Sequence, residues 1–181
     1  MPFTARRILV AGVSGVGKST LAARASVALD IPYVEMDDLH WGRDWAPRPD
    51  FLDEVRALAA RDAWITEWQY ASARPIVLER AEAIVWLDLP TPVQMARLAR
   101  RTVSRRVRRT PIWSAGLVEP PLRTALSDPD HILRWGWRTR NKYRRGDTSI
   151  AERTRGREDI EIVHLRSARA ADRWVAGLAR P

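Results

Sequence analysis

Hydrophobic residues in this chain gather in short runs that alternate with longer amphipathic stretches. Five apolar runs are predicted to be strands, at residues 6–11, 33–36, 63–67, 83–88 and 160–165. Helical spacing predicts helices over residues 20–29, 50–61, 75–81, 91–109, 130–155 and 167–178, with a break in the fifth near Gly146. Short buried strands that alternate with helices are typical of a parallel sheet covered on both faces. The pattern therefore predicts a three-layer α/β fold.

The length and composition favour one enzyme-sized domain. A chain of 181 residues suits a single core, and we find no internal repeat or linker, so residues 1–181 are predicted to form one domain with a lid-like insert at about 97–145. The absence of cysteine excludes disulfide scaffolds, Cys-ligated zinc and thiol catalysis. No segment is typical of a signal peptide or a membrane span, so we expect a cytoplasmic protein without a membrane partner. We expect the protein to be either a monomer or a homodimer.

A glycine-rich segment between the first predicted strand and helix carries the strongest chemical signal. Its residues, Gly12-Val13-Ser14-Gly15-Val16-Gly17-Lys18-Ser19, match the phosphate-binding loop (P-loop) pattern G-x-x-x-x-G-K-[ST]. Glycines let backbone N–H groups turn toward a phosphate, and the helix that follows points its positive end at the same anion. Lys18 is expected to reach the β- and γ-phosphates, and the Ser19 hydroxyl to bind Mg²⁺. The predicted nucleotide contacts are Gly12, Ser14, Gly15, Val16, Gly17, Lys18, Ser19 and Thr20.

Acidic residues follow the predicted strands at their carboxyl ends, where open α/β sheets bind ligands. Asp37 and Asp38 follow the second strand, and we predict that they act on an acceptor or in the metal shell. Glu67 ends the third strand and is predicted to belong to the metal shell. The alternative is that these acids are solvated turn formers. Asp88 ends the fourth strand and is followed by Leu89. Motor ATPases carry a water-activating Glu at the position of Leu89, so its absence counts against a motor ATPase.

The positive charge of the chain is concentrated in one segment. The whole chain has 31 basic and 22 acidic residues, whereas residues 97–145 hold 14 basic and 3 acidic ones and so carry about +11. Four arginines share one face of the predicted helix: Arg97, Arg101, Arg105 and Arg108. We predict a lid that closes over phosphates. Two alternatives stay open, a solvated helix face and a nucleic-acid contact in which aromatic residues stack on bases, namely Trp135, Trp137 and Tyr143.

Nine tryptophans are many for this length. Three of them are predicted to belong to the core: Trp64, Trp86 and Trp174. Three others lie near the predicted acceptor side and are expected either to pack or to line a substrate pocket: Trp41, Trp45 and Trp68.

Several segments together resemble a known group over nearly the whole chain. These are GVSGVGKST, IPYVEMDDLHW, RDAWITEWQY, IVWLDLP and IVHLRS. They are similar to the adenylate-kinase-like P-loop NTPases, in particular to the group called DNA-topology modulation (FlaR-like) proteins. The resemblance implies strand order 2-3-1-4-5, a lid after the fourth strand, and ATP with Mg²⁺. It also implies phosphate and metal roles for Lys18 and Ser19, an acidic site at Asp37 and Asp38, ATP contacts for Arg97 and Arg101, and an adenine neighbour in Arg166.

The segment after the third strand departs from that group, which usually has Asp-Gly-Asn-Tyr there. This chain has Glu67-Trp68-Gln69-Tyr70, so Trp68 replaces a glycine where a substrate would pass, and we expect a changed or blocked acceptor site. The leading hypothesis is an ATP- and Mg²⁺-dependent kinase of a small molecule, with nucleosides and nucleotides among its candidate acceptors. Its predicted catalytic residues are Lys18, Asp37, Asp38, Arg97 and Arg101. The alternatives are a nucleic-acid-associated P-loop protein and a nucleotide-binding regulator without transfer activity.

Overall fold

The centre of the molecule is a five-stranded parallel sheet with strand order β2-β3-β1-β4-β5. The computed structural model describes residues 3–109, 112, 120–125 and 127–178. The strands are β1 (Arg7–Ala11), β2 (Tyr33–Val34), β3 (Trp64–Glu67), β4 (Ala83–Leu87) and β5 (Glu161–Leu165). In the register, Val10 lies opposite Glu67 and Leu87 opposite Leu165, so these strands end at one edge. The predicted sheet and its order are confirmed.

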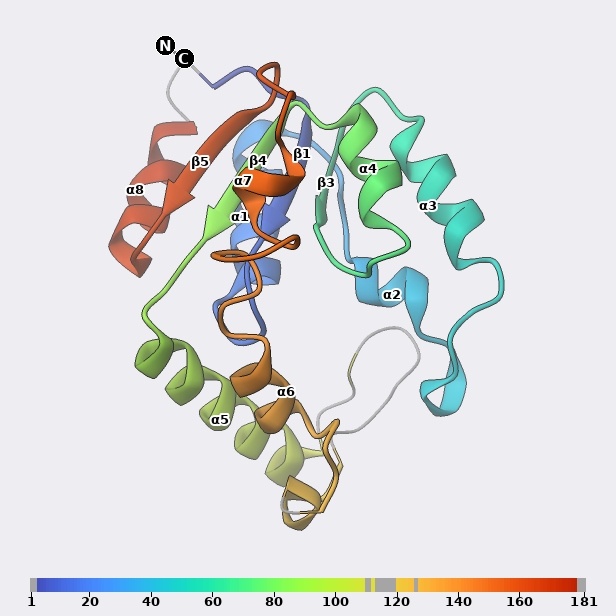
Figure 1. The fold of residues 1–181 in the computed structure, drawn as a ribbon, viewed down its shortest axis with the longest axis vertical. Coiled ribbons are helices and arrows are strands. Elements are labelled where there is room, and N and C mark those ends of the chain that lie inside the picture. The colour runs from blue at the N-terminus through green and yellow to red at the C-terminus, as the bar shows by residue number, and fades with distance from the viewer. Residues whose placement is uncertain (1–2, 110–111, 113–119, 126, 179–181) are drawn as a thin grey trace.

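Helices cover both faces of the sheet, because successive strand residues point to opposite sides. Ile8 and Val10 pack into a core with helices α1 (Lys18–Leu29) and α8 (Ala168–Leu178). Leu9 and Ala11 face the other core, with α3 (Phe51–Ala59) and α4 (Arg74–Arg80). Figure 1 shows the sheet between these layers. The predicted three-layer architecture is confirmed, and no described helix is long and apolar enough to cross a membrane.

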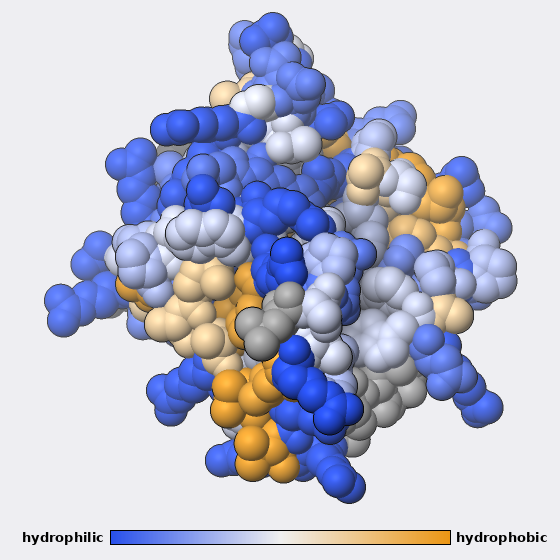
Figure 2. All heavy atoms as spheres, turned by 60° about the horizontal axis from the view of Figure 1, so that its bottom comes forward, coloured by the Kyte–Doolittle hydropathy of each residue, from blue (hydrophilic) through white to orange (hydrophobic). Residues whose placement is uncertain are grey.

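Two helices lie beyond the carboxyl ends of the strands, α5 (Thr91–Arg108) and α6 (Ile132–Arg138), with the short 3₁₀ helix η2 (Leu122–Ala125) beside them. In Figure 1 they form the lower part of the molecule, and Figure 2 shows both hydrophilic and hydrophobic residues on the surface of this end. Most of the predicted loop at 110–121 falls outside the described residues. The helices lie where the resemblance puts a lid.

Two predicted elements are wrong in their bounds. The second strand ends at Val34, and Met36–His40 forms the short helix α2, because the Met36 N–H donates to the Glu67 carboxylate. The predicted helix over 130–155 is two short helices, α6 and α7 (Ile150–Arg153). It stops at Arg138 because the Thr139 hydroxyl bonds back to a carbonyl of the preceding turn, and Gly146 then adopts a positive φ of 71°. A 3₁₀ helix that the pattern did not predict, η1, spans Arg43–Trp45.

Candidate phosphate-binding site

The P-loop leaves β1 at Gly12 and enters α1 at Lys18, and its course depends on glycine at two positions. Gly17 directly precedes the helix and has φ 101°, a backbone conformation that residues with a side chain rarely adopt. Gly15 has φ 88°, and a Cβ atom there would lie 2.7 Å from the Cβ of Leu98. The loop therefore turns sharply and lies directly against α5.

A buried carboxylate is fixed beside the loop. The Ser19 hydroxyl donates to Oε1 of Glu67 at 2.7 Å, and the Tyr33 hydroxyl donates to the same oxygen at 3.0 Å. The Met36 N–H donates to Oε2 at 3.1 Å. Glu67 is only 1% exposed, so three donors compensate for the loss of water around its charge. The structure thus places the predicted metal-shell carboxylate in contact with the predicted metal-binding hydroxyl.

Lys18 lies among charges that come from three elements, β3, α2 and α5, and from the residue just before α2. Burial lowers the pKa of its ammonium, and Glu67 and Asp37 oppose that effect. Arg101 on α5 lowers the pKa further, and Glu35, just before α2, raises it. The structure therefore brings four of the predicted site residues together: Lys18, Asp37, Glu67 and Arg101. The pattern missed Glu35, although it stands two residues before Asp37. Asp38 is the next residue on α2 and is partly buried.

Asp37 is held in place by an aromatic group. The Tyr70 hydroxyl donates to Oδ1 of Asp37 at 2.5 Å, and burial together with the Asp37 charge raises the pKa of Tyr70. The His40 ring stacks on Tyr70 with 3.9 Å between ring centroids, and Phe51 meets both rings edge-on. These contacts fix one carboxylate oxygen of Asp37, and the other accepts no hydrogen bond from the described residues.

Helix α5 contacts the P-loop through two side chains. The Arg97 guanidinium donates to the carbonyl of Val16 at 3.2 Å, and the Gln94 amide donates to the carbonyl of Ser14 at 2.7 Å. Sequence reasoning found Arg97 but missed Gln94, which is 1% exposed and uncharged. Its position three residues before Arg97, on the same helix face, was the available signal. Loop and basic helix therefore form one connected unit.

Comparison with known proteins identifies solved structures that share this fold. No family model and no curated protein matches this sequence. A gluconokinase from Sinorhizobium meliloti 1021 is similar in structure, with 23% identity and a TM-score of 0.52, over 97% of this chain and 92% of that one. The chain has the P-loop kinase fold. An uncharacterized protein from Eubacterium ventriosum ATCC 27560 is also similar, with 13% identity and a TM-score of 0.50, over 96% of this chain and 98% of that one.

Within this fold, Trp68 packs in the core, which is one of the two outcomes expected for it. Its side chain is fully buried. The ring stacks on Tyr143 with 5.9 Å between centroids, and the Tyr143 hydroxyl donates to the Trp68 carbonyl at 2.5 Å. A partner 75 residues away thus accounts for a large ring in place of the usual glycine. Trp41 and Trp45 are partly buried and meet each other edge-on at 5.7 Å.

The other strand-end and core expectations have mixed outcomes. Trp64 is fully buried as predicted, whereas Trp86 and Trp174 are only partly buried. Trp86 stacks flat on His164, whose Nε2 lies 3.0 Å from Asp88. Asp88 also accepts a hydrogen bond from Arg144 at 2.7 Å, so its carboxylate is used to connect structural elements.

Some predicted roles remain predictions. Arg166 is exposed after β5, and Thr20 is exposed in the first turn of α1. No three His, Cys, Asp or Glu side chains form a metal-binding group within the described ranges. One hydroxyl and one carboxylate, as in Ser19 and Glu67, nevertheless suit Mg²⁺, which keeps several waters and takes substrate phosphates as ligands.

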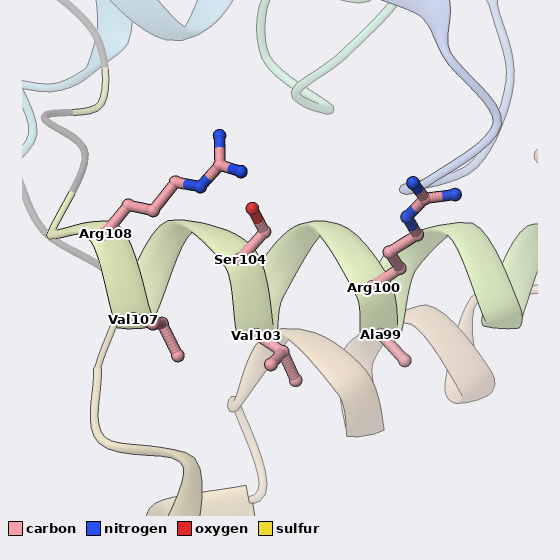
Figure 3. A pocket seen from close by; sticks show the side chains of 6 residues that line it. All are labelled: Ala99, Arg100, Val103, Ser104, Val107 and Arg108. Carbon is pink, nitrogen blue, oxygen red and sulfur yellow. The ribbon is translucent and has the colours of Figure 1, made fainter.

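A separate hollow of about 510 Å³ runs along α5. In Figure 3, Ala99, Val103 and Val107 point to one side of the helix, while Arg100, Ser104 and Arg108 point to the other. None of the predicted site residues lines this hollow. It is therefore distinct from the group around Lys18.

Proposed function

We propose that this chain is an ATP- and Mg²⁺-dependent kinase that phosphorylates a small molecule. The observation that carries the proposal is the 2.7 Å hydrogen bond between Ser19 and the buried Glu67, beside the ammonium of Lys18. Hydroxyl, carboxylate and ammonium at the start of a helix are the groups that hold a magnesium–triphosphate complex. The short segments D-D-L-x-W and L-R-S support membership of the DNA-topology modulation (FlaR-like) group, and we propose a cytoplasmic location.

In this proposal the loop amides and Lys18 hold the β- and γ-phosphates, and Arg97 and Arg101 stabilise charge on the phosphoryl group during transfer. Ser19 would bind Mg²⁺ directly, with Glu67 reaching it through water. The metal, when bound, neutralises phosphate charge and draws electrons from the bond that breaks. Arg97 already contacts the loop, so the lid helix needs little rearrangement to reach the nucleotide.

Asp37 is the proposed base for the acceptor, with Asp38 beside it. Tyr70 occupies one oxygen of Asp37, and the other can accept the proton of an acceptor hydroxyl. The acceptor oxygen then bonds to the γ-phosphorus, the bond between that phosphorus and the bridging oxygen breaks, and ADP leaves. The ring of Trp68 is buried against Tyr143, and this core packing favours transfer over a regulator without transfer activity.

The test is replacement of the P-loop lysine. We expect Lys18→Ala to weaken Mg·ATP binding at least about a hundredfold, because the charge that meets the β- and γ-phosphates is lost. Isothermal titration calorimetry gives the affinity, and circular dichroism checks that thermal unfolding is unchanged. The matched control is Arg169→Ala, an exposed cation in the first turn of α8, which should bind Mg·ATP as the wild type does. Unchanged affinity in Lys18→Ala would refute the proposal.

A further inference from the structure

The chain has only two lysines, and in the folded protein the second one lies near the first. Arginine accounts for 29 of the 31 basic residues, leaving Lys18 and Lys142. Lys142 lies in the turn between α6 and α7 and is partly buried. Burial, together with the nearby charges of Arg74 and Lys18, lowers the pKa of its ammonium to about 8. Two segments far apart in sequence therefore deliver compact cations to one place.

Arg74 adds a third cation, at the start of α4. It is 5% exposed, and its guanidinium lies 5.8 Å from the ring centroid of Trp68 and 5.6 Å from that of Tyr143. The Lys142 ammonium lies 5.7 Å from the same Tyr143 centroid. Within the described part of the chain, Nε of Arg74 has no hydrogen-bond partner, and neither cation forms an ion pair with a carboxylate. Buried cations without a counter-charge destabilise the folded protein, and an anionic ligand would relieve that cost.

Hydrogen bonds fix the residues around these two cations, and these residues adjoin the proposed site. The Tyr143 hydroxyl donates to the Trp68 carbonyl at 2.5 Å, and Trp68 directly follows Glu67. The Thr148 hydroxyl donates to the Lys142 carbonyl at 2.6 Å, which holds the turn that carries the ammonium. The cations are therefore positioned next to the end of β3 before any ligand arrives.

We propose that Lys142, supported by Arg74, forms an oxyanion subsite beside the P-loop. It takes a phosphate or carboxylate group, either the phosphoryl group in transfer or an acidic group on the acceptor. The proposal rests on the proposed kinase function and deepens it.

The test uses orthophosphate as the probe, titrated calorimetrically into protein whose P-loop is already filled. One arm uses Mg·ADP, and the other uses Mg²⁺ with the non-hydrolysable β,γ-imido analogue of ATP. We expect orthophosphate to bind the wild type and Lys142→Met to bind it about tenfold more weakly, the effect of losing one charged hydrogen bond. Arg145→Met, which removes an exposed cation three residues later, should leave binding unchanged, and Lys142→Arg should keep most of it.

The two arms separate the two sources of the anion. Binding only to the ADP complex supports a subsite for the transferred phosphoryl group, and binding to both complexes supports an acidic group on the acceptor. Equal effects of Lys142→Met and Arg145→Met, or no orthophosphate binding by the wild type, would overturn the subsite. The kinase proposal is judged separately, because it fails only if Lys18→Ala still binds Mg·ATP normally.

Discussion

Cations near the P-loop and cations on the outer surface of the same molecule have different surroundings. On the outside, arginines lie within 3.1 Å of a carboxylate, in the pairs Arg138–Asp130, Arg144–Asp88, Arg155–Glu152 and Arg157–Asp159. At the site, Arg74 and Lys142 have no such partner within the described ranges, and Lys18 shares its carboxylates with other groups. The difference lies in compensation of charge, not in the amount of charge.

This difference changes how the basic segment is interpreted. An exposed ion pair adds about 0–1 kcal/mol to stability, so the paired outer arginines have small energetic consequences. The exposed Trp135 and Trp137 also have arginines over their rings, Arg138 at 5.0 Å and Arg140 at 4.2 Å. Much of the charge that suggested a nucleic-acid partner is thus engaged within the protein. The uncompensated cations Arg74 and Lys142 lie instead beside the ring of Tyr143, next to the proposed site.

After Lys18→Ala, the next largest effect is expected from removing the charge that Ser19 contacts. We expect Glu67→Gln to lower the affinity of the ATP-bound protein for Mg²⁺ about 10–100-fold, because an outer-shell carboxylate positions the metal's ligands. The matched control on the outer surface is Glu152→Gln, which loses only the exposed pair with Arg155. Magnesium titrations at fixed ATP concentration measure both variants. Similar behaviour of the two variants would erase the distinction between site and surface charges.

A smaller effect concerns pH and the uncompensated Lys142. Its pKa is about 8 in the folded protein against an ordinary value of 10.5, with Arg74 and Lys18 as the charges that repel it. Between these values the unfolded chain holds a proton that the folded protein has lost, so the free energy of unfolding rises with pH. Lys142→Arg stays charged throughout. Urea unfolding should therefore show the wild type gaining stability relative to Lys142→Arg from about pH 8 to about pH 10.

The neighbouring Tyr143 does not confuse that comparison. Burial raises its pKa to about 12, and both proteins carry it. Stability curves that stay parallel across this pH range would contradict the idea that Lys142 is a buried cation without a counter-charge.

The parts of the molecule that the sequence predicts are those that depend on neighbouring residues. The P-loop follows from glycines at fixed spacing, and the strands follow from local apolar runs. Helix α2 could not be predicted in this way, because the bond from Met36 to Glu67 joins residues 31 positions apart. The burial of Trp68 depends on Tyr143, and the cation pair of Arg74 and Lys142 depends on the same ring. Such long-range contacts decide which predicted charges reach the site.

The proposed reaction is phosphoryl transfer from ATP to a small molecule, and its most specific readout is ADP release in the presence of candidate acceptors. The panel holds nucleosides, nucleotides and polar metabolites, with and without acidic groups, assayed with wild type and Lys18→Ala. We predict that at least one acceptor raises ADP release above the rate with water alone in the wild type, and that Lys18→Ala loses this stimulation. No stimulation by any acceptor, or equal stimulation in Lys18→Ala, would contradict the account.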